Sequence, residues 1–261
     1  MASQVGGKQR PKSLPPPPLP AYSTSTTEGT APPPTDQTPP QQPQTKRQFP
    51  PVFNMYQESG FSKRHYTIGE HQATPLYAVT VYPGWSGKPS VVLHGGPSDA
   101  HPPLAAIDQS SFGSAATVTL PPADAPPSSV AAVKIESAGG GFRLPTYTFN
   151  VGTGLFQWRH SGGAEVRSLD GRGAGWKLVR LAPDAPAARG ATFASDGGEV
   201  VAAWAWASGS LTKKFKFRFL GTGASGVLGE RWAVMAVASA LKIWDSERRR
   251  RNAAAGGGGG A

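Results

Sequence analysis

The sequence predicts a mainly β protein, with a closed antiparallel barrel of about 12 strands that encloses a hydrophobic C-terminal α-helix, preceded by a disordered proline-rich tail. Three observations predict this arrangement. Prolines are concentrated at the start of the chain, short β-type runs follow from Arg64 onward, and one long apolar run comes near the end. Together they indicate a single folded domain of roughly 190 residues after the tail, which is ample for one core.

The first 60 residues are expected to be a disordered tail. They hold about half of the 27 prolines, many Gln, Ser and Thr residues, and no tryptophan. A segment with so few large apolar side chains buries too little surface to offset the conformational entropy lost on folding. The stretch "SLPPPPLP" at residues 13–20 can form a polyproline II helix of the kind that SH3, WW or profilin-type domains bind. One hypothesis is therefore a scaffold or adaptor that acts through this tail without binding lipid.

The absence of cysteine excludes several kinds of site at once. Disulfides, thiol nucleophiles and thiolate metal sites all need that residue. The first residues, "MASQVGGKQRPK", contain no apolar run of the signal-peptide type, and Ala2 stands where N-myristoylation needs glycine. We expect a cytoplasmic protein, with a peripheral membrane or a nuclear location as alternatives. The formal net charge of +10 favours anionic partners such as nucleic acid, anionic lipid or acidic proteins.

From Arg64 onward the chain alternates short β-type runs with turn-forming segments, the pattern of an all-β sandwich or barrel. Segments rich in Gly, Pro, Ser and Asp, such as "PGWSGKP", "HSGG" and "DGRGAG", separate the runs. The expected strands are residues 65–69, 76–82, 90–95, 103–108, 116–120, 129–136, 145–151, 155–161, 164–169, 175–181, 191–196, 199–207 and 213–221.

The last of these runs shows how a strand can line a barrel. In "KKFKFRF", Phe215, Phe217 and Phe219 fall on one face and basic side chains on the other, because successive strand residues point to opposite sides. An antiparallel sheet with one apolar face needs a cover for that face. About a dozen strands can close into a barrel, which also removes exposed edges. A barrel of that size has a lumen wider than its own side chains fill, so something else must occupy its axis.

The apolar run near the end of the chain has the right shape to fill that lumen. The run from Trp232 to Trp244 is shorter than the roughly 20 apolar residues that a transmembrane helix needs. Its large side chains point in nearly every direction on a helical wheel, so no broad polar face remains for lying on a membrane. We therefore expect a buried helix over about residues 228–249 in a domain that spans residues 61–250. Residues 251–261 are expected to be a flexible glycine-rich tail.

This order of elements resembles the tubby C-terminal-like fold, which tubby proteins share with the plant LURP-one-related proteins and the phospholipid scramblases. The phrases "LYAVTVYPGWSGKPSVVLHGGP", "FQWRHSGG", "GWKLVRL", "SDGGEVVAAWAWA" and "KFKFRFLGTGASGVLGERWAVMAVASALKIW" resemble a group of functionally uncharacterised fungal proteins assigned to that fold, over residues 62–248. The resemblance implies a closed barrel around a central helix. It also implies binding of phosphoinositide headgroups through basic side chains on the barrel surface, although no individual residue is carried over. Scramblase activity is not expected, because this chain lacks the cysteine-rich palmitoylated segment of those proteins.

No motif in the chain predicts catalysis or a metal site. The motif "GTGASG" at residues 221–226 matches the G-x-G-x-x-G of dinucleotide-binding folds, but the preceding strand has a polar face and no second strand follows. We expect it to be a flexible turn through which the chain leaves the barrel wall. The five histidines form no zinc-binding pair, and neither Ser86 nor Ser225 stands in a G-x-S-x-G nucleophile elbow. We therefore expect a non-enzymatic protein without a cofactor or metal.

What remains is a basic surface. Lys213, Lys214, Lys216 and Arg218 lie on one expected strand, and the last three share its outward face. We hypothesise that this face binds anionic lipid headgroups, phosphoinositides in particular, and that each basic residue contributes about 1 kcal/mol near such a bilayer. Basic residues of other strands that could join it are Arg159, Arg167, Lys177 and Arg180. An ordinary solvated face is the alternative.

Two other interpretations concern the remaining positive charge and the tryptophans. The run Arg248–Arg251 is expected to be a solvated tail, with a nuclear-import or membrane-surface patch as the alternative. Nucleic acid is a third class of partner, since Trp158 and Trp176 could stack on bases, but aromatic residues in strands more often belong to a core. Lipid binding therefore ranks above nucleic acid binding.

Overall fold

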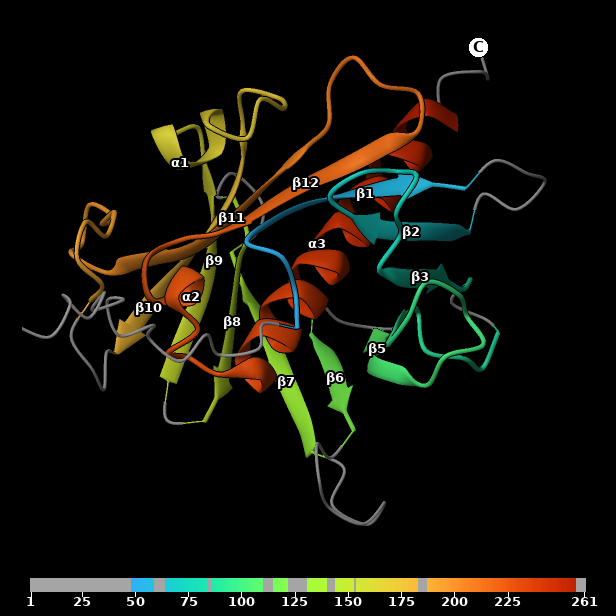
Figure 1. The fold of residues 1–261 in the computed structure, drawn as a ribbon, viewed down its shortest axis with the longest axis horizontal. Coiled ribbons are helices and arrows are strands. Elements are labelled where there is room, and N and C mark those ends of the chain that lie inside the picture. Colours follow the sequence, from blue (N-terminus) through green and yellow to red (C-terminus); the bar gives the residue numbers. More distant parts are fainter. Residues whose placement is uncertain are drawn as a thin grey trace, which may run out of the picture. The chain divides into compact units, whose positions relative to one another are not determined.

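The computed structural model describes residues 48–58, 64–83, 86–109, 115–121, 131–139, 144–152, 154–182 and 187–256. Twelve strands in this part of the chain form a closed antiparallel barrel, and a long helix runs through it (Figure 1). The strands are β1 (Val52–Gln57), β2 (His65–Gly69), β3 (Tyr77–Val81), β4 (Val91–His94), β5 (Pro103–Gln109), β6 (Ala116–Leu120), β7 (Ala131–Ala138), β8 (Thr146–Val151), β9 (Gly154–Ser161), β10 (Gly175–Ala182), β11 (Glu199–Trp206) and β12 (Lys213–Phe219). The helices are α1 (Ala164–Arg167), α2 (Gly221–Ser225) and α3 (Glu230–Gly256). The fold class expected from the sequence is confirmed.

Consecutive strands pair with each other around the barrel, and β1 closes the wall between β2 and β12. The folded part therefore begins earlier than the tail expected over residues 1–60 allows. In β1, Phe53 and Met55 are buried, and Phe53 stacks on Phe217 of β12 with 4.8 Å between ring centroids. The prolines just before Val52 give this segment the composition of the tail, which concealed the strand. The motif at residues 13–20 lies outside the described residues.

Two of the expected strands have other structures. Residues 164–169 form α1 and a turn, because Gly162 and Gly163 end β9 before them and Val166 can pack across the outside of β11. Residues 191–196 make only an isolated bridge, in which Phe193 pairs with Glu199. Turns at Gly190 and Gly197, whose φ angles are 75° and 80°, leave that segment too short for a strand.

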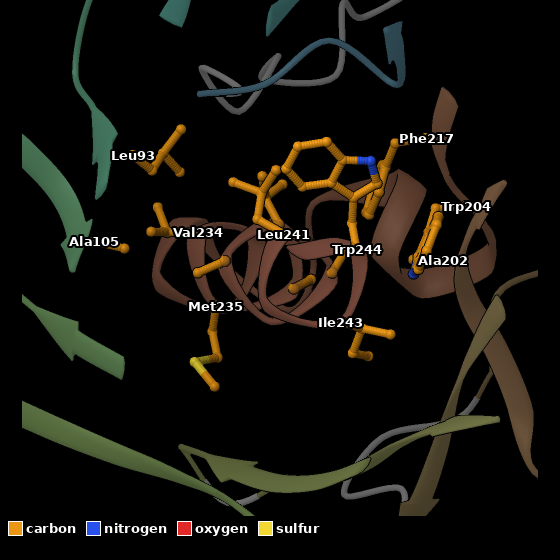
Figure 2. Packing of buried hydrophobic residues seen from close by; sticks show 14 of the residues in the cluster. Leu93, Ala105, Ala202, Trp204, Phe217, Val234, Met235, Leu241, Ile243 and Trp244 are labelled. Atoms are coloured by element: carbon orange, nitrogen blue, oxygen red, sulfur yellow. The ribbon is translucent and has the colours of Figure 1, made fainter. Parts of the chain in front are cut away.

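Helix α3 fills the barrel, as its apolar wheel predicts. Its side chains are buried at Trp232 and from Val234 to Ser246. Figure 2 shows large side chains leaving the helix in several directions, with Val234 and Leu241 toward Leu93. The alanines between them keep the helix thin enough to be enclosed on all sides. One polar contact lies inside, where the Trp158 indole N–H donates to Ser239 Oγ at 2.8 Å.

Hydrogen bonds fix the segment that connects β12 to α3. The "GTGASG" motif forms the short helix α2 and its C-cap, where a flexible turn was expected. The buried Glu199 carboxylate accepts the Thr222 backbone N–H at 2.7 Å and the Thr222 hydroxyl at 2.9 Å, which fixes α2 against β11. Gly221 and Gly226 have φ angles of 47° and 81°, so they supply the left-handed positions at either end. The motif is therefore a fixed connection that leads the chain from the barrel wall to the central helix.

The two ends of the barrel are different. We call the rim where α3 begins the N-terminal mouth, and the rim where α3 leaves the C-terminal mouth. In Figure 1 the last turns of α3 emerge beside β1 and β12. The helix continues to Gly256, seven residues past its expected end at residue 249. None of the helices within the described ranges is long and apolar enough to cross a membrane.

Candidate anion-binding site

The basic strand predicted from the sequence is β12, and its alternation is as expected. Phe215, Phe217 and Phe219 are buried inside the barrel, whereas Lys214, Lys216 and Arg218 alternate with them and are half-buried. Lys213 begins the strand at the C-terminal mouth, with its ammonium nitrogen 5.7 Å from the centroid of the Tyr56 ring.

Other parts of the chain cover most of this basic face of β12. The turn after α1 crosses the outside of β11, because Val166 and Leu169 pack on Ala203 and Ala205. It brings the Asp170 carbonyl to 2.6 Å and its carboxylate to 3.5 Å from Lys216 Nζ.

The other two side chains of this face also have partners within the chain. Arg218 Nη1 lies 3.2 Å from Ser168 Oγ, and Lys214 Nζ donates to the Leu211 carbonyl at 2.6 Å. The side chain of Lys216 is only 15 % exposed, so the middle of β12 is a covered strip.

The four basic residues expected to extend that face do not join it. Arg159 Nη1 contacts Asp196 Oδ2 at 2.6 Å, and Lys177 Nζ lies 3.6 Å from Glu165 Oε1. The remaining two are Arg167, which donates to the carbonyl of Gly162, and Arg180, which is buried. These basic side chains are thus engaged within the barrel wall and its turns.

A second basic group, which the sequence suggested to be a solvated tail, lies at the C-terminal mouth. Residues 248–251 are four consecutive arginines on α3, and consecutive helical residues are about 100° apart. They therefore reach different parts of the rim: Arg249 Nη2 donates to the Tyr82 carbonyl after β3 at 3.3 Å, and Arg251 lies over Trp206 of β11 with 4.0 Å from Cζ to the ring centroid. We call Lys242 and Arg248–Arg251 the basic rim.

Two of these arginines are held by a buried carboxylate. Asp245 is 1 % exposed and accepts from Arg248 Nη2 at 2.6 Å and from Arg249 Nε at 2.7 Å. Both pairs span one helical turn, the spacing at which side chains on a helix meet. Burial raises the pKa of the Tyr66 hydroxyl on β2, while the positive charge of Arg248 acts to lower it. Asp245 thus holds both arginines inward, and Arg249 ties the end of α3 to the wall through the Tyr82 carbonyl.

The second carboxylate at this mouth is held by tryptophans. Glu247 accepts the Trp176 indole N–H at 2.9 Å and the Trp206 indole N–H at 2.6 Å. Arg251 Nη2 is 3.8 Å from the same carboxylate, a looser contact, and the Arg251 side chain is 46 % exposed. The guanidinium of Arg251 is thus stacked on one face and open to solvent.

Lys242 lies deeper, beneath Tyr147 of β8. Its ammonium nitrogen is 4.1 Å from the centroid of the Tyr147 ring, and Arg250 hydrogen-bonds that tyrosine's hydroxyl. The pKa of Lys242 is lowered to about 8, chiefly by burial and also by the positive charge of Arg250, while the negative charge of Asp245 acts in the opposite direction. The positive charges of Lys242 and Arg250 thus repel each other at this place on the rim.

One feature of the basic rim, the continuation of the helix through its arginines, could have been predicted from the sequence. The spacing of Asp245 from Arg248 and Arg249, and of Glu247 from Arg251, is the i to i+3 and i+4 pattern of a continuing helix. Together the basic rim has five basic side chains against two carboxylates, so it keeps a positive excess. Its chemistry suits binding of phosphate or carboxylate groups, since arginine binds both through charge-assisted hydrogen bonds.

The comparisons leave the family open. Comparison of the chain with protein families, with curated proteins and with solved structures gives no match. The barrel with its long C-terminal helix agrees with the tubby-like architecture that the sequence resembles. Among the described residues, no cluster of His, Asp and Glu side chains could hold a metal ion.

Proposed function

We propose that the protein is a non-enzymatic binding protein that recognises anionic membrane lipid, phosphoinositides in particular, and that the basic rim makes the contact. The observation that carries this proposal is the arrangement of Arg248–Arg251 at the C-terminal mouth. Two of these arginines are held inward by Asp245, and Arg250 and Arg251 are exposed. The exposed pair is therefore available to a ligand outside the barrel.

The spread of the charge favours a surface over a single small anion. The arginines point to separate parts of the rim, toward β2, β3, β8 and β11. Their charges do not converge on one pocket, so a plane that carries many phosphates satisfies more of them than one phosphate does. Lys213 begins β12 at the same mouth and adds to the positive potential. Each basic residue close to an anionic bilayer contributes about 1 kcal/mol.

We also infer that the chain is a member of the tubby C-terminal-like group. The support is the strand number, the closed antiparallel order and the buried C-terminal helix, all of which the resemblance implies. The proposed lipid contact, however, shifts from the predicted strip Lys214–Arg218 to the end of α3. The reason is physical, because the strip is already paired with the turn after α1.

Vesicle flotation tests the proposal. The full chain is mixed with phosphatidylcholine vesicles, with or without a phosphoinositide, at low and at high salt. We expect binding only with the phosphoinositide, and weaker binding at high salt because ions screen exposed charges. The variant Arg250→Ala with Arg251→Ala should bind about 30-fold more weakly, which corresponds to the loss of two such contacts.

The matched control removes two exposed basic residues elsewhere. Lys134→Ala with Arg189→Ala lowers the net charge equally but changes β7 and a distant loop. It should bind nearly as well as the wild type. Equal weakening by both variants would mean that overall charge, and not the basic rim, drives binding. No binding of the wild type to any vesicle would reject lipid recognition and direct attention to partners of the proline-rich segment.

A further inference from the structure

A cavity lies at the opposite end of the barrel, at the N-terminal mouth. It has a volume of about 300 Å³ and is bounded by β5, β6 and the first turns of α3. Its floor is apolar, since Leu104 is half-buried and Leu120 and Val234 are buried. Two exposed charged residues, Glu230 and Arg231, stand at its edge. An apolar cavity with a few polar groups is the usual form of a small-ligand site, and this one is at the lower end of the usual range.

The two charges at the edge have no partners in the described part of the chain. The ion pairs found there involve other residues, and neither Glu230 nor Arg231 donates or accepts a side-chain hydrogen bond. Burial raises the pKa of the nearby Tyr77 hydroxyl, and the negative charge of Glu230 raises it further. The Glu230 charge is thus close enough to act on the Tyr77 hydroxyl. Exposed charges without partners beside an apolar floor suit a ligand that carries the opposite charges.

The spacing of the two charges limits the ligand. Glu230 and Arg231 are adjacent in α3, and adjacent helical side chains do not face each other. A ligand that meets both must therefore carry its positive and negative groups well apart. The ends of a dipeptide can be separated by about 7 Å, since an extended chain spans roughly 3.3–3.6 Å per residue.

We propose that this cavity binds the zwitterion of a short apolar peptide, two or three residues long. Its ammonium group pairs with Glu230 and its carboxylate with Arg231. Its apolar side chains cover Leu104, Leu120 and Val234. The inference is independent of the lipid proposal, because the cavity and the basic rim are at opposite ends of the barrel and share no residue.

Calorimetric titration of the full chain with the dipeptide Leu-Leu tests this inference. We expect saturable binding, and about fivefold weaker binding for Glu230→Gln and for Arg231→Gln, the effect of losing one partly exposed ion pair. The matched controls are Glu136→Gln and Lys134→Gln on the outside of β7, which should bind as the wild type does. Blocking both ends of the ligand, as in N-acetyl-Leu-Leu-amide, should weaken binding more than either variant does.

A steric variant gives a second test. Leu104→Trp fills the cavity from a half-buried position and should abolish Leu-Leu binding while the thermal unfolding transition stays cooperative. If that variant does not fold, the two charge variants decide the question. The inference is overturned if Leu-Leu does not bind saturably, if the blocked peptide binds equally well, or if the charge variants bind as the wild type does.

Discussion

Two basic runs of equal charge, Lys213–Arg218 on β12 and Arg248–Arg251 on α3, have different environments in the same barrel. The strand places every second residue on one side, so its basic side chains form a single row. A neighbouring turn can cover such a row, and the turn carrying Asp170 does so. The helix instead distributes its arginines around its axis, so no single neighbour can cover them all.

The difference shows that a count of charges does not locate a binding surface. In β12 the outward direction leads to partners within the chain, such as Ser168 and Asp170. The arginines at the end of α3 differ from one another. Arg248 and Arg249 contact a buried carboxylate, whereas the next two residues contact the rim but remain exposed. Secondary structure therefore decides which charges remain available.

The largest expected effect is on the free energy of unfolding, when Arg248 and Arg249, the inward pair, are replaced. Arg248→Ala with Arg249→Ala leaves Asp245 buried without the two guanidinium groups that it accepts hydrogen bonds from. We expect the free energy of unfolding to fall by about 3 kcal/mol, since removing the partner of a buried charge is costly. Urea unfolding followed by tryptophan fluorescence measures this change.

The matched control is the outward pair. Arg250→Ala with Arg251→Ala removes the same charge but should lower the free energy of unfolding by less than about 1 kcal/mol, as expected for exposed contacts. Equal destabilisation by both pairs would contradict the division into inward and outward arginines.

The second-largest expected effect is on lipid binding, where the exposed pair Arg250 and Arg251 should matter more than the basic residues of β12. Lys216→Ala with Arg218→Ala removes two charges from the covered strip and should weaken binding to phosphoinositide vesicles by less than about threefold. The outward pair of α3 should weaken it by about 30-fold, the equivalent of about 2 kcal/mol. Flotation under identical salt measures both. A larger loss from the β12 variant would return the lipid contact to the strand first predicted.

Much of the fold can be predicted from the sequence because its signals are local. The alternation in "KKFKFRF" and the apolar wheel of residues 232–244 each identify an element and its burial. The sequence does not reveal β1, because the prolines just before Val52 give this part of the chain the composition of the tail. Residues 164–169 were assigned to a strand because a segment this short has too few residues to show a helical period.

The candidate site is less predictable because its contacts are long-range. Trp176 and Glu247 are 71 positions apart, and Arg249 and Tyr82 are 167 apart. Such pairs depend on how the barrel closes around the helix, which no local pattern specifies. The spacing from Asp245 to Arg248 and Arg249 does predict that the helix continues, but it does not identify the rim residues.

The stability of the protein should depend on pH through Lys242, the buried member of the basic rim. The pKa of Lys242 is about 8 in the folded protein, against an ordinary 10.5. Between these values the unfolded chain holds a proton that the folded chain has released, so the free energy of unfolding rises with pH, by at most about 1.4 kcal/mol per unit. Lys242→Met should remove this rise, whereas Lys216→Met on β12 should retain it. Urea unfolding between pH 8 and pH 10 compares the three proteins, and a rise that persists in Lys242→Met would assign it to another group.

The smallest expected effect is at the β12 ion pair itself. Asp170 has a fully exposed carboxylate, and surface pairs of this kind contribute about 0–1 kcal/mol. A double-mutant cycle of Lys216→Ala and Asp170→Ala should therefore give a coupling energy below about 1 kcal/mol, and lower still at high salt. Such a value means that the lysine is covered by the packing of α1 and its turn, and not by the strength of its ion pair. Leu169 of that turn packs on the outer face of β11, so Leu169→Ala should detach the turn and expose Lys216. β12 should then be a stronger lipid-binding surface than it is in the wild type.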